Sequence, residues 1–233
     1  MSQPPPASPL QFQAFDAEAF GVRFYRVRDP RSGGLEQALA ALDDGAPLVV
    51  DAKLPAEDIE TAAALMRAGF RKVCVQIELH HSLDHPTPAP QRSQILDRVA
   101  FEPSAIRAHA RHFVYDRFAL DVALPTEGHD RLYEKWIRNS LEGSAHRLAV
   151  CGSNFITFKA EPDRIRIDLV SVLDKGQGVA SDLLRAVLQR AQERQCKHVE
   201  VVTESENLPA VRLYLKSDFV PVRFHSVFHL VRN

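Results

Sequence analysis

Cysteine is scarce in this sequence, and its three residues, Cys74, Cys151 and Cys196, lie far apart with no CxxC spacing. Isolated cysteines provide neither a disulfide framework nor the paired thiolates of a structural zinc site. We therefore expect three reduced thiols, most of them buried.

The sequence also lacks a long apolar run and an excess of either charge. No stretch approaches the roughly 20 apolar residues of a membrane span, and 29 Lys plus Arg balance 30 Asp plus Glu. This balance argues against nucleic acid or a membrane as a partner. The start, MSQPPPASPLQ, lacks the basic and apolar regions of a signal peptide, so we expect a cytoplasmic protein with a flexible proline-rich tail at 1–9.

What the sequence contains is an alternation of strand and helix patterns. Residues 20–28, for example, alternate apolar and charged side chains, as a half-buried strand does. Residues 80–94 carry three prolines and no periodicity, which predicts a loop or linker. In the first part we predict strands at 20–28, 47–54 and 71–79 and helices at 34–45 and 55–70.

The second part has the same mixed character. Three strands in sequence are followed by helix, strand, helix and strand, which is a mixed α/β arrangement. The predicted strands are 146–152, 154–161, 163–172, 197–203 and 219–231, and the predicted helices are 124–143, the segment from the glycine loop to about 194, and 207–217. We therefore predict an α/β fold with a mixed sheet, divided into an incomplete α/β unit at 10–90 and a larger domain at 91–233.

Two segments of the chain resemble each other. AALMRAGFRKVCVQIELH (63–80) aligns without gaps with RLYLKSDFVPVRFHSVFH (212–229), and both predict a helix, a tight turn and a strand. We expect two α/β units of similar build, with any active site in the second, because the first has no glycine-rich loop. The alignment pairs Leu65 with Tyr214, Phe70 with Phe219, and Val73 with Val222.

A glycine-containing junction, SVLDKGQGVASDLL (171–184), connects a predicted strand to a predicted helix. Free backbone N–H groups and the helix dipole at such a junction attract phosphate groups. A P-loop requires a lysine after its second glycine, whereas Lys175 precedes both glycines. A dinucleotide fingerprint, for which Glu200 lies at a suitable distance, requires a third glycine where Ser181 stands.

KGQGVA (175–180) resembles the [RQ]-x-x-G-x-[GA] motif of the Gcn5-related N-acetyltransferases. The strand IDLVSV (167–172) precedes it, and NLPAVRLY (207–214) matches that family's N-x-x-A-x-x-L-Y segment, with Phe219 where the family has Gly-Phe. The order and spacing of the three segments agree with the family. Lys175 replaces the usual Arg or Gln, and the approach to the loop is slightly shorter than usual.

This resemblance implies an acetyltransferase fold whose N-terminal half is an incomplete unit of the same kind. It also implies acetyl-CoA as co-substrate, without a metal, and a small-molecule amine as acceptor. In the family the strand's backbone N–H groups stabilise the oxyanion, the loop holds the pyrophosphate, and an asparagine bonds the pantetheine arm. The implied cofactor-binding residues are Val170, Ser171, Val172, Lys175, Gly176, Gln177, Gly178, Val179, Ala180, Ser181 and Asn207.

The resemblance implies that Tyr214 is the general acid, since a tyrosine keeps its proton at pH 7 and can pass it to a leaving thiolate. The general base stays open between Glu204, Glu206, Asp168 and a chain of waters. Within the family, DRLYEKWIRNSLEG (130–143) and the N-terminal half most resemble enzymes acting on dTDP- or UDP-linked amino sugars. Another amine (an aminoglycoside, a polyamine or a protein N-terminus) or a non-catalytic CoA-binding sensor is the alternative, and a homodimer is left open.

Some aromatic and histidine residues have two interpretations. Tyr133 and Trp136, on one predicted helix, would stack on the acceptor or pack in the core. His225 and His229 share a strand face and would line the pocket or be structural. The cluster of histidines at 80–85 (His80, His81 and His85) invites a metal site, but with no cysteine or second ligand set beside it we expect no metal.

Overall fold

The computed structural model describes residues 8–143 and 146–232, so residues 1–7 of the predicted tail lie outside the described residues. Pro9, at the end of that tail, already accepts a 2.8 Å hydrogen bond from the Arg28 N–H. The strands are β1 (Leu10–Phe12), β2 (Arg23–Val27), β3 (Leu48–Pro55), β4 (Arg71–Ser82), β5 (Gln94–Leu96), β6 (Arg147–Cys151), β7 (Asn154–Ala160), β8 (Arg164–Ser171), β9 (His198–Glu204) and β10 (Val220–Arg232). The helices are α1 (Ala14–Phe20), α2 (Leu35–Ala41), α3 (Ile59–Arg67), α4 (Pro103–Ala110), α5 (Thr126–Leu141), α6 (Val179–Glu193) and α7 (Leu208–Lys216).

These elements confirm the mixed α/β prediction, since β2–β3 and β8–β9 pair in parallel and the other strand pairs are antiparallel. The sequence predictions missed the short elements β1, β5, α1 and α4, because segments of three to eight residues show too little periodicity to detect. Among the described helices, none is long and apolar enough to cross a membrane.

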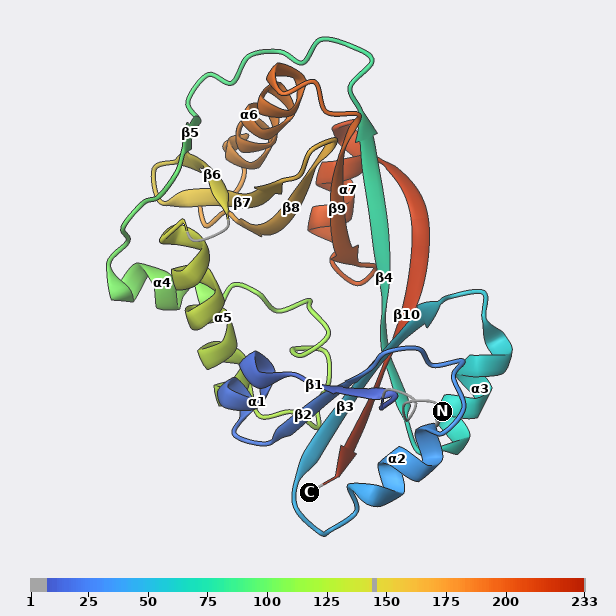
Figure 1. Ribbon diagram of the computed structural model, residues 1–233. Helices are drawn as coiled ribbons and strands as arrows, with labels where there is room; N and C mark the ends of the chain where they lie inside the picture. Colours follow the sequence, from blue (N-terminus) through green and yellow to red (C-terminus); the bar gives the residue numbers. More distant parts are fainter. Residues whose placement is uncertain (1–7, 144–145, 233) are drawn as a thin grey trace, which may run out of the picture.

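The strands form one ten-stranded sheet in the order β1-β2-β3-β10-β4-β9-β8-β7-β6-β5. Each half of the chain thus places its last strand inside the other half: β10 lies between β3 and β4, and β4 lies between β10 and β9. In Figure 1 these two long strands run side by side and connect the upper and lower parts of the molecule. The division of the chain into two units near residue 90 stays a prediction. The sheet order shows that β4 and β10 are exchanged across this boundary.

The internal repeat is confirmed by the register of the exchanged strands. On the β4–β10 pair, His80 lies opposite Val220 and Arg71 lies opposite His229, which are equivalent pairs in the sequence alignment. The two register shifts are equivalent as well, since one skips Val222 and the other skips Val73. The pairing of the two strands is therefore two-fold symmetric about the opposed residues Gln76 and His225.

The symmetry continues into the helices that precede the exchanged strands. The Asp58 side chain caps α3 by accepting from the Thr61 N–H, and Asn207 caps α7 by accepting from the Ala210 N–H. These caps occupy equivalent positions when the alignment is extended without a gap. The two units differ where the chemistry was expected, because Pro55 and Leu65 stand in the first half where Glu204 and Tyr214 stand in the second.

Three clusters of buried apolar side chains hold the layers together. One lies between α6, α7 and the C-terminal strands, and another lies between α2, α3 and the N-terminal strands. The third joins both halves, because α1, α4 and α5 pack on the opposite face of the sheet. There Gly128 of α5 lies against Phe20 of α1, where an added Cβ would meet the ring at 2.4 Å.

Candidate active site

A cavity of about 740 Å³ opens between β8 and β9. Its walls come from both strands, the glycine loop, the first turn of α6, α7, α5 and the segment 111–118. Fourteen of the residues singled out from the sequence line it: Tyr133, Trp136, Asp168, Val170, Val172, Lys175, Gly176, Gly178, Val179, Ala180, Ser181, Glu204, Asn207 and Tyr214.

The cavity exists because two parallel neighbours separate. The β8–β9 pairing extends from Arg164 opposite His198 to Arg166 opposite Glu200 and goes no further. Beyond that point residues 167–170, Val172 and residues 201–204 line the cavity instead of forming a ladder. Backbone N–H groups on this edge of β8 are thereby freed from β9, and such free donors can stabilise an oxyanion.

The glycine loop is shaped for an anion. Gly176 and Gly178 have φ values of +77° and +71°, a conformation that favours glycine. A Cβ on Gly176 would meet no atom of the described residues within 4 Å, so the space beside this glycine is open. Gly178 is the N-cap of α6, and no side chain caps the helix there, which leaves the first N–H groups available to a ligand. Lys175 adds a cation beside them. These residues fit the pyrophosphate of a coenzyme A.

The loop is held from behind by the linker that precedes β5. Asp182, in the first turn of α6, accepts from the N–H groups of residues 91–93 at 2.8–3.0 Å and from the Ser93 hydroxyl at 2.7 Å. Although burial alone would raise it, these donors lower the pKa of Asp182 to about 2. The same linker places Arg92 against the loop, where it donates to the Gln177 carbonyl at 2.8 Å.

Two of the predicted cofactor-binding residues do not line the cavity. The Ser171 side chain is fully buried on the other face of β8, where its hydroxyl lies 2.7 Å from Nδ1 of His109. Strand alternation requires this, because Val170 and Val172 face the cavity. Gln177 is exposed, and its carbonyl is bonded to Arg92.

Tyr214 and Asn207 reach the cavity from α7. Tyr214 is 3% exposed and packs against Phe219 with ring centroids 5.5 Å apart. Burial, followed by the nearby Glu204 charge, raises the pKa of Tyr214 above its ordinary value, so the phenol holds its proton firmly. Asn207 caps α7 through its side-chain oxygen, and its amide nitrogen remains for a second partner.

Glu204 ends β9 and lines the cavity beside a residue from the first half of the chain. The Gln76 amide donates a 3.1 Å hydrogen bond to the Glu204 carboxylate. Burial raises the pKa of Glu204, and the Asp116 charge adds to the rise, whereas Gln76 and Arg117 act in the opposite direction. Glu206, the other carboxylate considered at this strand end, is exposed and bonded to Ser205.

Asp168 serves a structural role on the opposite wall. Its carboxylate accepts from the Trp136 indole at 2.9 Å and lies 2.8 Å from the His146 ring. Although burial opposes it, these partners hold the pKa of Asp168 below its usual value. A carboxylate with a lowered pKa and two partners is a poor base, and its contact with the indole orients Trp136 toward the cavity.

Tyr133 is buried in α5 and lines the inner wall. It stacks on Phe113 at 4.4 Å, with Trp136 at 5.6 Å on the same helix. Burial, followed by the charge of Asp116, raises the pKa of Tyr133 well above its usual value. Tyr133 therefore meets both expectations, since it is a core residue that also faces the cavity.

The segment 111–118 was missed by sequence reasoning, although it supplies eight of the lining residues. It has no periodicity that would assign it to an element, and its one signal is the density of charged and aromatic residues in RHFVYDRF. Two contacts anchor it to the rest of the chain: Asp116 lies 2.8 Å from His129, and Arg117 lies 3.6 Å from Asp51. Within the segment, the Arg117 guanidinium lies 4.1 Å above the Phe118 ring.

The histidines of β10 do not line the cavity. His229 is fully buried, and its Nδ1 lies 2.8 Å from Asp121. His225 lies opposite Pro55 of β3 and Gln76 of β4 and is not among the residues that line the cavity. Neither residue therefore lines the cavity, and His229 has the buried, bonded setting of a structural histidine.

Comparison with known proteins supports one family. Residues 151–219 match the profile of the Acetyltransferase (GNAT) family. A curated relative is the spore coat polysaccharide biosynthesis protein SpsD of Bacillus subtilis (strain 168), which is 23% identical over 125 residues, or 51% of this chain. The aligned part spans 43% of that relative, less than half of its length.

Solved structures resemble the whole chain. A GCN5-related N-acetyltransferase from Sphaerobacter thermophilus superposes with a TM-score of 0.61 at 17% identity, covering 96% of this chain and 76% of that one. A tandem GNAT protein from the clavulanic acid biosynthesis pathway gives a TM-score of 0.56 at 17% identity, covering 91% and 76%. At this level of identity the matches establish the fold, and their coverage includes the N-terminal half.

Proposed function

We propose that the chain is a Gcn5-related N-acetyltransferase that transfers an acetyl group from acetyl-CoA to a primary amine, since residues 151–219 match the profile of that family. One observation carries the proposal. The glycine loop, the separated edge of β8, Asn207 and Tyr214 all line the same cavity, in the order that the sequence motifs imply.

In this proposal the cofactor enters along the separated strands. Lys175 and the backbone from Gly176 to Ser181 hold its pyrophosphate, the edge of β8 at residues 170–172 faces its pantetheine arm, and Asn207 donates to that arm through its free amide. The bound thioester supplies the acetyl group and a thiolate leaving group. The protein contributes backbone N–H donors for the developing oxyanion, which elsewhere stabilise a transition state by about 3–4 kcal/mol each.

Two side chains are proposed to move protons. Glu204 accepts a proton from the incoming ammonium group, because its raised pKa lies closer to neutrality and it faces the cavity. Tyr214 donates a proton to the departing thiolate, and its raised pKa ensures that the phenol carries that proton at pH 7. We favour Glu204 over Asp168 and Glu206, because Asp168 is paired and Glu206 points into solvent.

The leading acceptor is a nucleotide-linked amino sugar. The chain resembles dTDP-fucosamine acetyltransferase in its N-terminal half and in the α5 segment, and the name of the Bacillus relative refers to polysaccharide biosynthesis. Among the residues that line the cavity, Tyr115 and Trp136 are available for stacking on a sugar or base, and Arg111 and Arg166 for phosphates.

A panel of dTDP- and UDP-linked amino sugars, tested with acetyl-CoA and scored by released thiol, tests the proposal. We expect turnover with at least one member, and none with the matching sugars that lack the amino group. Turnover only with a polyamine, an aminoglycoside or a peptide would support the acetyltransferase function but overturn the assignment of an amino sugar as the acceptor. Failure to bind acetyl-CoA at millimolar concentration, measured by calorimetry, would overturn the function itself.

A further inference from the structure

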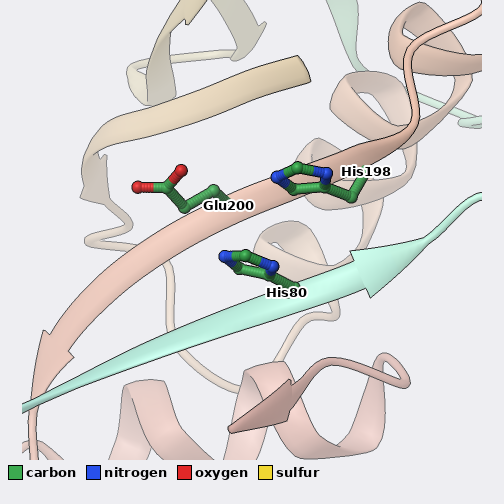
Figure 2. Close-up of side chains that lie close together, drawn as sticks. All are labelled: His80, His198 and Glu200. Carbon is green, nitrogen blue, oxygen red and sulfur yellow. The ribbon is translucent and has the colours of Figure 1, made fainter. Parts of the chain in front are cut away.

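A group of potential metal ligands lies on one face of the sheet, outside the lining of the cavity. His80 of β4 stands directly opposite Glu200 of β9, and His198 lies two residues before Glu200 on the same face. One ligand atom from each residue lies within 4.8 Å of the other two. Figure 2 shows the two imidazoles one above the other, each with one ring nitrogen on the side of Glu200.

The two imidazoles stack face to face. Their ring centroids are 4.4 Å apart and their planes differ by 16°. Nε2 of His198 is buried and has no hydrogen-bond partner among the described residues. A buried imidazole nitrogen without a partner is a group whose desolvation is uncompensated until something binds it.

Charged side chains surround the three residues. Glu78, on the same face of β4, lies 2.9 Å from Nε2 of His80. An ion bound at Nε2 would displace this contact, whereas an ion bound at Nδ1 would keep it as the carboxylate–histidine contact that orients metal-ligating imidazoles. Arg166 and Arg164 lie 3.1 and 3.6 Å from the Glu200 carboxylate. Both arginines are partly exposed, and Arg164 is also bonded to Glu161 at 2.7 Å, so it has a second carboxylate when Glu200 is engaged.

We propose that His80, His198 and Glu200 bind a divalent transition-metal ion of the zinc type. Two imidazoles and a carboxylate suit Zn²⁺, Co²⁺ or Ni²⁺, whereas Mg²⁺ and Ca²⁺ prefer sites made of oxygen ligands. His80 and His198 are partly exposed, and rotation of their rings would bring both nitrogens to the buried Glu200 carboxylate. From the sequence alone we expect no metal, because the histidines at 80–85 have no second set of ligands near them. The pairing of β4 with β9 supplies that second set.

The position of the site suggests its role. His80 comes from the strand that the first half of the chain contributes, and His198 and Glu200 come from the second half. A bound ion would therefore join the exchanged strand β4 to β9 and add stability to the contact between the halves. Since the three ligands do not line the cavity, acetyl transfer is not expected to require the ion.

The test is a titration of the full, tag-free chain after removal of metals with EDTA. Zn²⁺ is added in competition with a chromogenic chelator, and Co²⁺ binding is followed by visible absorption. We expect one equivalent of either ion to bind, Mg²⁺ not to compete, and Zn²⁺ to raise the melting temperature. His198→Asn and His80→Asn should each weaken Zn²⁺ binding about a hundredfold or more, because each removes a ligand.

The matched control is His85→Asn, since His85 is an exposed histidine of the neighbouring loop. It should bind Zn²⁺ as the wild type does. Wild-type affinity in both ligand variants, or an equal loss in the control, would overturn the proposal. If circular dichroism shows that His198→Asn does not fold, His80→Asn decides alone. The EDTA-treated protein should retain any acetyltransferase activity, so failure here leaves the proposed function standing.

Discussion

The amide of Gln76 donates a 3.1 Å hydrogen bond to the Glu204 carboxylate across the β4–β9 pair, where the two residues stand directly opposite each other. Gln76 belongs to the first half of the chain and lies at the centre of the internal two-fold relation. The exchange of β4 thus brings a polar side chain of one repeat into the site of the other. The N-terminal half contributes to the cavity through this residue.

Replacing Gln76 by leucine is expected to shift the pH dependence of turnover. The Gln76 hydrogen bond favours the ionised form of Glu204, so its loss should raise the pKa of that carboxyl further. A base with a higher pKa becomes deprotonated only at higher pH. The acidic limb of the kcat/KM profile should therefore shift to higher pH. Initial rates between pH 5 and 9, with acetyl-CoA saturating, provide the measurement.

The control for this prediction is the neighbouring carboxylate. Glu204→Gln should abolish the acidic limb and lower kcat about a hundredfold, whereas Glu206→Gln should leave the profile unchanged because Glu206 is exposed. An unchanged pH–rate profile in the Glu204 variant would show that Glu204 is not the general base. A shift in the Glu206 variant would assign the base to Glu206.

Tyr214→Phe is expected to lower turnover about a hundredfold while leaving acetyl-CoA binding almost intact. The substitution keeps the ring that packs on Phe219 and removes the phenolic proton. Stopped-flow release of thiol and calorimetric titration of the cofactor separate the two effects. An undiminished rate of thiol release would show that another group protonates the thiolate.

The sequence predicts the C-terminal part of this fold well, because its elements carry long periodic patterns and its motifs have fixed spacing. β6 to β10 follow the predicted order, and the glycine loop and Tyr214 meet in one cavity. The alignment of the two halves even places Val73 with Val222, and those are the residues skipped at the two register shifts. Local pattern and global fold agree in these regions.

What the sequence could not predict depends on pairing over long distances. Nothing local to Gln76 indicates that it will stand opposite Glu204, because strand exchange is decided by the packing of both halves. The segment 111–118 has no period, so its place on the cavity wall follows only from its anchors at His129 and Asp51. His80 and His198 become neighbours for the same reason, through the β4–β9 register.

Gly176→Ala is expected to weaken acetyl-CoA binding. The left-handed conformation costs a non-glycine residue about 1–2 kcal/mol, and the new methyl group would extend into the open side of the loop. Gly152→Ala is the matched control, because Gly152 also has a positive φ, of 61°, and an open side, but lies outside the cavity. Both variants should lose stability, and calorimetry should find weaker cofactor binding in the Gly176 variant alone.

Asp182→Asn is expected to destabilise the protein at pH 7 by about 2 kcal/mol or more, since a charged acceptor of several hydrogen bonds is lost. The pKa of Asp182 is about 2 in the folded protein, below its ordinary value of 3.8. A lowered pKa stabilises the fold above that ordinary value and loses its effect as the pH falls toward 2. Urea unfolding at several pH values should therefore show the two proteins converging in acid. A constant difference from pH 7 to pH 2 would contradict the role of the charge.

Asn207→Ala and Asp58→Ala form a matched pair, because the two residues cap α7 and α3 at equivalent positions. Loss of either cap should cost about 1 kcal/mol of unfolding free energy, with a small addition for Asp58 from its exposed ion pair with Arg31. Only the Asn207 side chain faces the cavity, so only its loss should also raise the dissociation constant of acetyl-CoA. Equal cofactor binding in both variants, measured by calorimetry on protein shown to be folded, would assign Asn207 to the helix cap alone.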